Sequence, residues 1–222
     1  MCGRFTYATA PEITAEFFEL TSVPELKPRY NIAPTQPVPV ILVSAEDSCR
    51  KLRPLHWGLI PHWAKDPGIG ARMINARAET VATKPAFRAA FRERRCLIAA
   101  DGFYEWQKLP RGKQPFYIRL SNAEPFAFAG LWEHWEGPDG AGIGSCTILT
   151  TEPNEVLRPI HNRMPVILHP KDFSKWLDRA TKQTNALEAL LRPYPTEAMT
   201  AYPVSTRVNS PTRDDAGCIE HI

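Results

Sequence analysis

The first apolar pattern in the chain predicts a helix. Ile13, Phe17 and Leu20 recur at helical spacing. They follow Thr9-Ala10-Pro11-Glu12, which has the form of a capping box. We therefore expect a short amphipathic helix over residues 10–20.

The next segments predict strands around a second helix. Residues 37–43 are rich in β-forming side chains and residues 52–59 alternate apolar with polar ones, so the two should be neighbouring strands. A helix is expected from Thr83-Lys84-Pro85, ending before a buried strand at residues 96–100. Its apolar side carries Phe87, Ala90 and Phe91, and the rest of its surface carries Arg88, Arg92, Arg94 and Arg95.

The second half of the chain reads mainly as strands with short helices. The apolar segments are short and separated by turn residues, which is typical of a largely antiparallel sheet. No linker or repeat divides the sequence, so we predict one α+β domain over residues 1–222, with a frayed tail at about 211–222. The expected strands are 115–120, 126–132, 145–151, 165–168 and 199–204, the expected helices are 170–180 and 185–191, and a glycine-rich hairpin region spans 136–144.

Composition narrows the class of protein. There are 22 prolines among 222 residues, which disfavours long helices, and the net charge is only +3, which argues against a protein that coats duplex DNA. Five cysteines, none in C-x-x-C spacing, suit a reducing compartment. No signal peptide or membrane-spanning run is evident, so we expect a cytoplasmic protein with no membrane partner.

Several common sites are missing from the sequence. It holds no phosphate-binding P-loop, no G-x-S-x-G and no H-E-x-x-H motif. The glycines Gly140, Gly142 and Gly144 lie between strands, so they indicate a hairpin and not a phosphate cradle. No histidine pair or histidine–cysteine pair has metal-ligand spacing, so neither a metal nor another cofactor is expected.

The most informative chemistry lies at the start of the chain. If Met1 is removed, Cys2 carries a free α-amine beside its thiol. Such a 1,2-aminothiol captures an aldehyde, because the amine forms an imine and the thiol then closes a five-membered thiazolidine ring. Gly3 permits close approach and Arg4 supplies a fork for phosphate. The alternative is that Cys2 is a small apolar anchor.

Three further stretches concentrate polar side chains. Residues 74–79 alternate, so as a strand they would place Asn75, Arg77 and Glu79 on one face, either as a binding surface or as a solvated edge. Glu105 lies between aromatic residues, where burial would raise its pKa and suit it to acid–base catalysis; the alternative is an exposed carboxylate. His161, with Arg163 close by, offers a titratable ring or a structural histidine.

These motifs, in this order, resemble the SOS response-associated peptidase family, whose members sense abasic sites in single-stranded DNA. The likeness spans nearly the whole chain. Its motifs are Cys2-Gly-Arg-Phe5, Arg29-Tyr-Asn-Ile-Ala-Pro34, Trp57-Gly58, Asn75-Ala-Arg-Ala-Glu79, Ala100-Asp-Gly-Phe-Tyr-Glu-Trp106, Ile160-His-Asn-Arg-Met-Pro165, Pro203-Val-Ser205 and Val208-Asn209.

The resemblance implies a fold, a partner and a set of roles. The fold is a mostly antiparallel, β-barrel-like core with short peripheral helices, and the partner is single-stranded DNA in a positively charged groove. Cys2 would form a thiazolidine with the aldehyde of the abasic sugar, Asn75 would orient the sugar or the N-terminus, Glu105 would act as acid and base, and His161 would assist ring opening and closure. The residues implied to contact DNA are Arg4, Arg77 and Arg163 for phosphates and Trp57, Trp63 and Trp106 for bases.

The family reading leaves two other functions open. Cys2 is also suited to an N-terminal-nucleophile peptidase that acts on itself or on a substrate, and the domain is also suited to non-catalytic binding of single strands. In the loop at residues 61–72, the aromatic residues stand at other positions than in some relatives. The resemblance therefore does not tell which side chains would separate neighbouring bases. We expect a monomer that meets replication-fork proteins and gathers at damaged DNA in the nucleoid.

Overall fold

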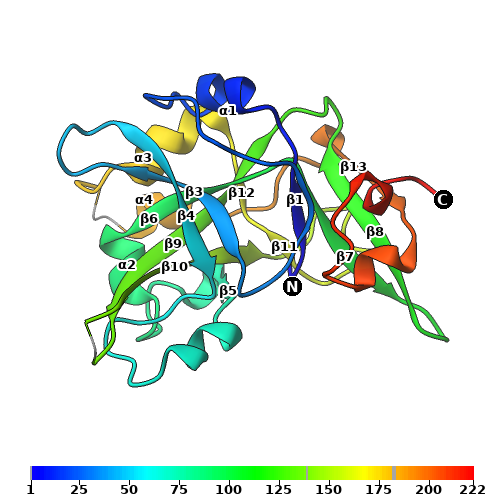
Figure 1. Ribbon diagram of the computed structural model, residues 1–222. Helices are drawn as coiled ribbons and strands as arrows, with labels where there is room; N and C mark the ends of the chain where they lie inside the picture. The colour runs from blue at the N-terminus through cyan, green and yellow to red at the C-terminus, as the bar shows by residue number, and fades with distance from the viewer. Residues whose placement is uncertain (1, 139, 182–183) are drawn as a thin grey trace.

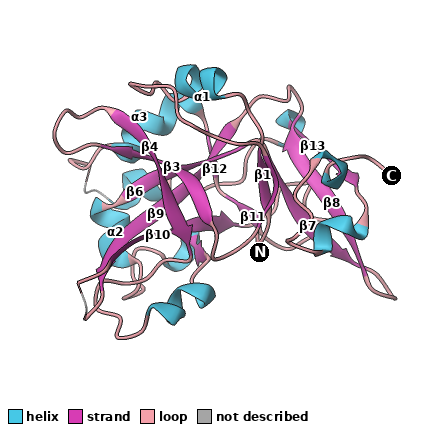
Figure 2. Cartoon of the chain, in the orientation of Figure 1, coloured by secondary structure: helices cyan, strands magenta, loops and turns pink. Residues whose placement is uncertain are grey.

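Five strands close into a small barrel in the computed structural model, which describes residues 2–138, 140–181 and 184–222 (Figures 1 and 2). Antiparallel pairs run in the order β4–β3–β6–β9–β10, and a parallel pair between β10 and β4 completes the ring. The bounds are β3 Pro37–Val43, β4 Arg50–Trp57, β6 Arg95–Ala100, β9 Phe126–Glu136 and β10 Gly142–Thr151.

A second, open sheet lies beside the barrel. Its order is β13–β8–β7–β1–β2, and the pairings are antiparallel. In Figure 1, β1 lies between the barrel and the strands β7, β8 and β13. The bounds are β1 Phe5–Tyr7, β2 Arg29–Ile32, β7 Gly102–Lys108, β8 Lys113–Leu120 and β13 Met199–Pro203.

The barrel is filled by side chains and closed at one end by the second sheet. Inside, Gly130 is needed because a Cβ there would lie 2.8 Å from the Sγ of Cys96. At one end the ring of Phe5, on β1, packs edge-on against Trp57 and Phe128, with centroids 5.2 and 5.6 Å apart. Because Phe5 is only three residues after Cys2, this plug fixes the start of the chain against the barrel end.

Short elements complete the molecule around the two sheets. Strand β5 pairs in parallel with β10, and β11 and β12 pair with β10 and β9. They are β5 Asn75–Arg77, β11 Met164–Pro165, β12 Ile167–Leu168, α1 Pro11–Phe17, α2 Arg88–Glu93, α3 Phe173–Leu177 and α4 Thr184–Glu188, with 3₁₀ turns at Pro67–Arg72, Ala78–Thr80, Pro170–Asp172, Thr196–Ala198, Thr206–Asn209 and Ala216–Cys218.

The predicted α+β class, the barrel-like core and most strands are confirmed. The pairing expected between residues 37–43 and 52–59 is the β3–β4 hairpin, and the buried strand at 96–100 is β6. The strands predicted at 126–132 and 145–151 extend to form a longer hairpin, β9–β10. Asp139, within the predicted hairpin region, lies outside the described residues.

The first helix differs from its prediction in length and in its buried face. Helix α1 stops at Phe17, and Thr9 does not cap it, because the Thr9 hydroxyl donates to Asp101 at 3.1 Å. Ile13 is 52% exposed, whereas Thr14 is buried. The capping-box prediction is therefore wrong, and the buried stripe lies one position further along than the apolar pattern indicated.

Other elements also depart from prediction. Arg95 was expected on an exposed helix surface, but it is buried at the start of β6, where it donates to the carbonyl oxygens of Phe91 and Trp176 at 2.8 and 2.6 Å. The strand predicted over 74–79 ends at Arg77, because the chain turns into a 3₁₀ helix. The helices predicted at 170–180 and 185–191 are the shorter α3 and α4.

The C-terminal tail is attached to the second sheet, so the prediction that residues 211–222 fray is wrong. The carboxylate of Asp214 accepts hydrogen bonds from the backbone N–H groups of Tyr30 and Asn31 at 2.5 and 2.8 Å, and it pairs with Arg29. Cys218 is fully buried. One acidic side chain thus ties the tail to β2.

Replacing Asp214 with alanine should lower the free energy of unfolding by about 1–3 kcal/mol, because two N–H groups on β2, one of them on the buried Asn31, lose a charged acceptor. Urea denaturation measures this loss, with Asp172→Ala as an acidic control away from β2. A tail that contributes nothing would leave both variants at wild-type stability.

Candidate active site

Four side chains predicted to carry chemistry converge at the barrel end that Phe5 closes. Cys2 precedes β1, Asn75 begins β5, Glu105 lies on β7, and His161 precedes β11. Pairing of β1 with β7 and of β5 with β10 brings these distant segments together. We call Cys2, Asn75, Glu105 and His161 the Cys2 cluster.

The Cys2 backbone and thiol are both held in place. The side-chain amide of Asn75 donates to the carbonyl oxygen of Cys2 at 2.8 Å. The Sγ atom is fully buried and lies 3.9 Å from the carbonyl oxygen of Arg4. Burial raises the pKa of the Cys2 thiol well above its usual range, and the charge of Glu105 raises it further. The thiol is therefore protonated near neutral pH and needs a base to react.

Glu105 is placed to serve as both acid and base. Its side chain is almost completely buried, and this desolvation raises the pKa of the carboxyl group to about 7. Near neutral pH the protonated and ionised forms are therefore both populated. Because the charge of Glu105 raises the pKa of the Cys2 thiol, ionisation of the carboxyl group makes ionisation of the thiol less favourable.

His161 faces Glu105 in its neutral form. Burial lowers the pKa of its imidazole, and its Nε2 lies 3.9 Å from the Glu105 Oε2. The backbone N–H of Arg163 donates to the His161 Nδ1 at 3.0 Å. The Arg163 carbonyl oxygen also lies 3.2 Å from Nδ1, so the Arg163 backbone holds the ring in place whichever ring nitrogen carries the proton.

Because folding favours the protonated Glu105, stability should depend on pH through this group. Its pKa is raised, so its contribution is complete below about pH 4–5 and is lost as the pH rises through about 7. Glu105→Gln, which is always neutral, should be more stable than wild type by about 2–3 kcal/mol at pH 8 and similar to it at pH 4. Urea denaturation at both pH values measures this, and an equal difference at both would contradict it.

Two of the three predicted phosphate-binding arginines are engaged within the protein. Arg4 donates to Asn31 Oδ1 and to the Val208 carbonyl oxygen, both at 2.7 Å. Arg163 forms a two-point ion pair with Glu79, with distances of 2.6 and 3.0 Å. Arg77 is exposed and makes no hydrogen bond or ion pair with other described residues. Of the three, Arg77 is the one most accessible to a phosphate.

The three predicted base-stacking tryptophans fall in different environments. Trp57 is fully buried and its indole N–H donates to Ile74, so the prediction that it stacks on a base is wrong: it is part of the barrel plug. Trp63 is 53% exposed. Trp106 is half-buried, lies under the Arg4 guanidinium at 6.0 Å, and donates to Asn209 at 2.8 Å. Trp63 and Trp106 remain candidates for stacking.

Sequence reasoning did not single out Asn31 as a site residue. Its side chain is buried, accepts from Arg4 and donates to the carbonyl oxygens of Ser210 and Arg213 at 2.9 and 2.6 Å. Asn31 thereby links Arg4, two residues after Cys2, to the C-terminal tail. The available signal was a polar residue in the middle of the Arg29–Pro34 motif.

Two searches of the described residues gave negative findings. Within residues 2–138, 140–181 and 184–222, three or more His, Cys, Asp or Glu side chains do not gather where they could hold a metal ion. None of the helices in that part of the chain is long and apolar enough to cross a membrane.

Comparison with known proteins finds a family and relatives that match nearly the whole chain. Residues 1–211 match the family described as SOS response associated peptidase (SRAP). The abasic site processing protein YoqW of Bacillus subtilis is 46% identical, over 99% of both chains. The abasic site processing protein HMCES of Xenopus tropicalis is 34% identical, over 88% of this chain and 67% of its own.

A solved structure shows the same fold. The crystal structure of a protein from Bacteroides thetaiotaomicron superposes with a TM-score of 0.89, at 26% identity and over all of both chains. The family match covers residues 1–211, and the structural match covers the whole chain. This protein belongs to the SOS response-associated peptidase family.

Proposed function

We propose that this protein processes abasic sites in single-stranded DNA by bonding covalently to them through Cys2. The observation that carries the proposal is the placement of Cys2: Asn75 holds its backbone at 2.8 Å, and the charge of the buried Glu105 raises the pKa of its thiol. The names of the relatives supply the substrate class. The proposal requires removal of Met1.

The reaction consumes one aldehyde and releases one water. The α-amine of Cys2 adds to the aldehyde carbon of the ring-opened sugar, and the resulting carbinolamine loses water to give an imine. The imine nitrogen keeps its proton, and the Cys2 Sγ adds to the imine carbon while the thiol proton passes to the Glu105 carboxylate. The product is a thiazolidine that links residue 2 to the DNA.

The Cys2 cluster supplies the proton transfers. Protonated Glu105 donates to the departing hydroxyl of the carbinolamine, and the carboxylate so formed takes the proton from the Cys2 thiol, whose high pKa makes this assistance necessary. His161, whose Nε2 lies 3.9 Å from the Glu105 carboxylate, assists opening of the sugar ring. Asn75 keeps the reacting backbone in place.

The candidate DNA contacts are the arginines and tryptophans predicted from the sequence that remain accessible. Arg77 is available to a phosphate directly, whereas Arg4 and Arg163 would act from within their networks with Asn31 and Glu79. Trp63 and Trp106 are accessible for stacking on bases, which is worth about 1–3 kcal/mol per base. A single strand suits the buried thiol, because the abasic sugar can reach it without opening of a duplex.

The test compares three otherwise identical single strands: one with an abasic aldehyde, one with a tetrahydrofuran in place of that sugar, and one intact. We expect a product that survives denaturation with the aldehyde strand alone. Equal reversible binding to all three strands without any such product would indicate a non-catalytic single-strand binder instead. Turnover of peptides without capture of DNA would indicate a peptidase.

A further inference from the structure

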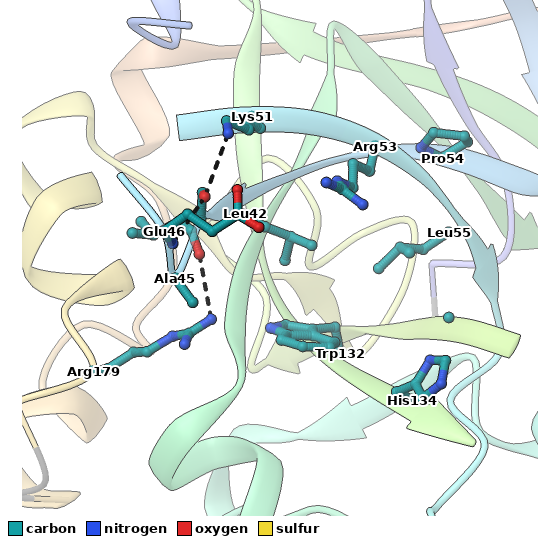
Figure 3. Close-up of a pocket in the computed structure, with 13 residues that line it drawn as sticks. Leu42, Ala45, Glu46, Lys51, Arg53, Pro54, Leu55, Trp132, His134 and Arg179 are labelled. Carbon is teal, nitrogen blue, oxygen red and sulfur yellow. Dashed lines mark hydrogen bonds between the residues drawn. The ribbon is translucent and has the colours of Figure 1, made fainter. Parts of the chain in front are cut away.

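A pocket of about 690 Å³ lies at the end of the barrel that Phe5 does not close, and Figure 3 shows the residues that line it. It is lined by the tips of the β3–β4 hairpin, by β9 and β10, and by Arg179 after α3. Strand β4 runs from this mouth, at Lys51, to the plugged end, at Trp57. The fully buried Val40, Cys96 and Cys146 lie on the intervening stretches of the barrel strands, so the pocket is a separate site.

The glycines of β10 explain why the mouth is open. Gly144 lines the pocket, and a Cβ there would lie 2.7 Å from the Cδ2 of Leu55. A Cβ at Gly142, on the same face of β10, would lie 2.7 Å from the His134 ring. Any side chain at these positions would fill the space or displace its walls. Gly144, which the sequence assigned to a hairpin, therefore also forms part of the wall of a cavity.

The walls combine an aromatic face with cationic groups. Figure 3 shows Trp132, Leu42 and Leu55 around the space, with Arg53 directed into it from β4 and Arg179 approaching from the other side. The side chains of Trp132 and the two leucines are half-buried, so their apolar surface remains available.

The cationic groups differ in how far they are already engaged. Lys51 is paired with Asp47 at 2.8 Å, and Arg179 donates to the Val43 carbonyl oxygen at 3.3 Å. Arg53 makes no hydrogen bond or ion pair with other described residues. Glu46 is the acidic side chain in the lining, so an anion is favoured on the side of Arg53 and away from Glu46.

We propose that this pocket binds a nucleotide, with its base against Trp132 and its phosphate on the guanidinium group of Arg53. A flat apolar wall beside an unneutralised guanidinium group fits an aromatic ring joined to an anion. The volume lies within the range of about 300–1,000 Å³ that is typical of small-molecule sites, which recur at the mouths of β-barrels. The nucleotide is either free or part of a DNA strand.

Calorimetric titration with thymidine 5′-monophosphate, thymidine and inorganic phosphate tests the proposal. We expect saturable binding of the monophosphate, and binding weaker by about tenfold or more for each of the other two probes. Arg53→Gln, an exposed substitution that should fold normally, should weaken the monophosphate by a similar factor, whereas Arg111→Gln, an exposed arginine in another turn, should not.

The source of the nucleotide is identified by competition. Displacement of the monophosphate by an intact single-stranded oligonucleotide assigns the site to DNA, and its persistence assigns the site to free nucleotides. Cys2→Ala should bind the monophosphate as wild type does, so the titration tests binding in this pocket independently of covalent capture. Equal affinity of wild type and Arg53→Gln, or of thymidine and its monophosphate, would overturn it.

Discussion

Replacing Cys2 with alanine should abolish the denaturation-resistant adduct with abasic single-stranded DNA. The variant keeps an α-amine at residue 2 but has no thiol to close the ring, so its imine remains open to hydrolysis. The measurement is the fraction of DNA that migrates with protein on a denaturing gel. Cys49→Ala, which removes a half-exposed cysteine of the β3–β4 turn, should react at the wild-type rate.

Borohydride separates the contributions of the amine and the thiol. With the reductant present, Cys2→Ala should again form a stable adduct, because the imine is reduced to an amine that cannot hydrolyse. Wild-type protein should need no reductant. If Cys2→Ala crosslinks as well as wild type without borohydride, the thiol has no part in the bond.

Replacing Glu105 with glutamine should slow adduct formation at neutral pH by about 10²-fold or more, the usual contribution of a positioned acid–base group. Glutamine preserves the shape of the side chain but neither donates the proton that the carbinolamine needs nor accepts the thiol proton. Single-turnover rates measure the effect. Glu155→Gln, an exposed substitution, is the matched control.

The pH profile shows whether Glu105 acts in the way proposed. Its pKa of about 7 in the folded protein means that the proton-donating form declines as the pH rises above neutrality. The wild-type rate should therefore fall on the alkaline side with an apparent pKa near 7, and Glu105→Gln should lack this limb. An unchanged alkaline limb in the variant would assign that titration to another group.

Strand periodicity predicted much of the barrel, and its failures have physical causes. Strands β3, β4, β6, β9 and β10 are long enough to show apolar runs or alternation. Strand β1 has three residues, and four successive residues of β7, Gly102 to Glu105, are buried, so neither strand shows a period of two. The closing contact between β10 and β4 joins strands far apart in the sequence, which local patterns do not report.

The residues of the candidate site could be predicted from the sequence, whereas the hydrogen-bond and ion-pair partners of its arginines could not. Cys2, Asn75, Glu105 and His161 were singled out by residue type and neighbours, and the fold brings them together. The partners of the arginines could not be foreseen. The Arg4–Asn31 contact spans 27 positions and the Arg163–Glu79 pair spans 84, so neither leaves a local trace in the sequence.

The burial of Trp57 also results from a contact between residues far apart in the sequence. A tryptophan beside Gly58 in a motif was interpreted as a surface for bases, but β1 lays Phe5 across it and removes it from solvent. The arrangement gives the two barrel ends different properties. One end is plugged and carries the N-terminal nucleophile, and the other is open because Gly144 has no side chain.

The most direct test of covalent capture by residue 2 is the intact mass of the crosslinked product, followed by peptide mapping. The account predicts the mass of the chain without Met1 plus the mass of the abasic strand, less one water, with the modification on Cys2. A product that retains Met1, or a modification that maps to a lysine side chain, would contradict it.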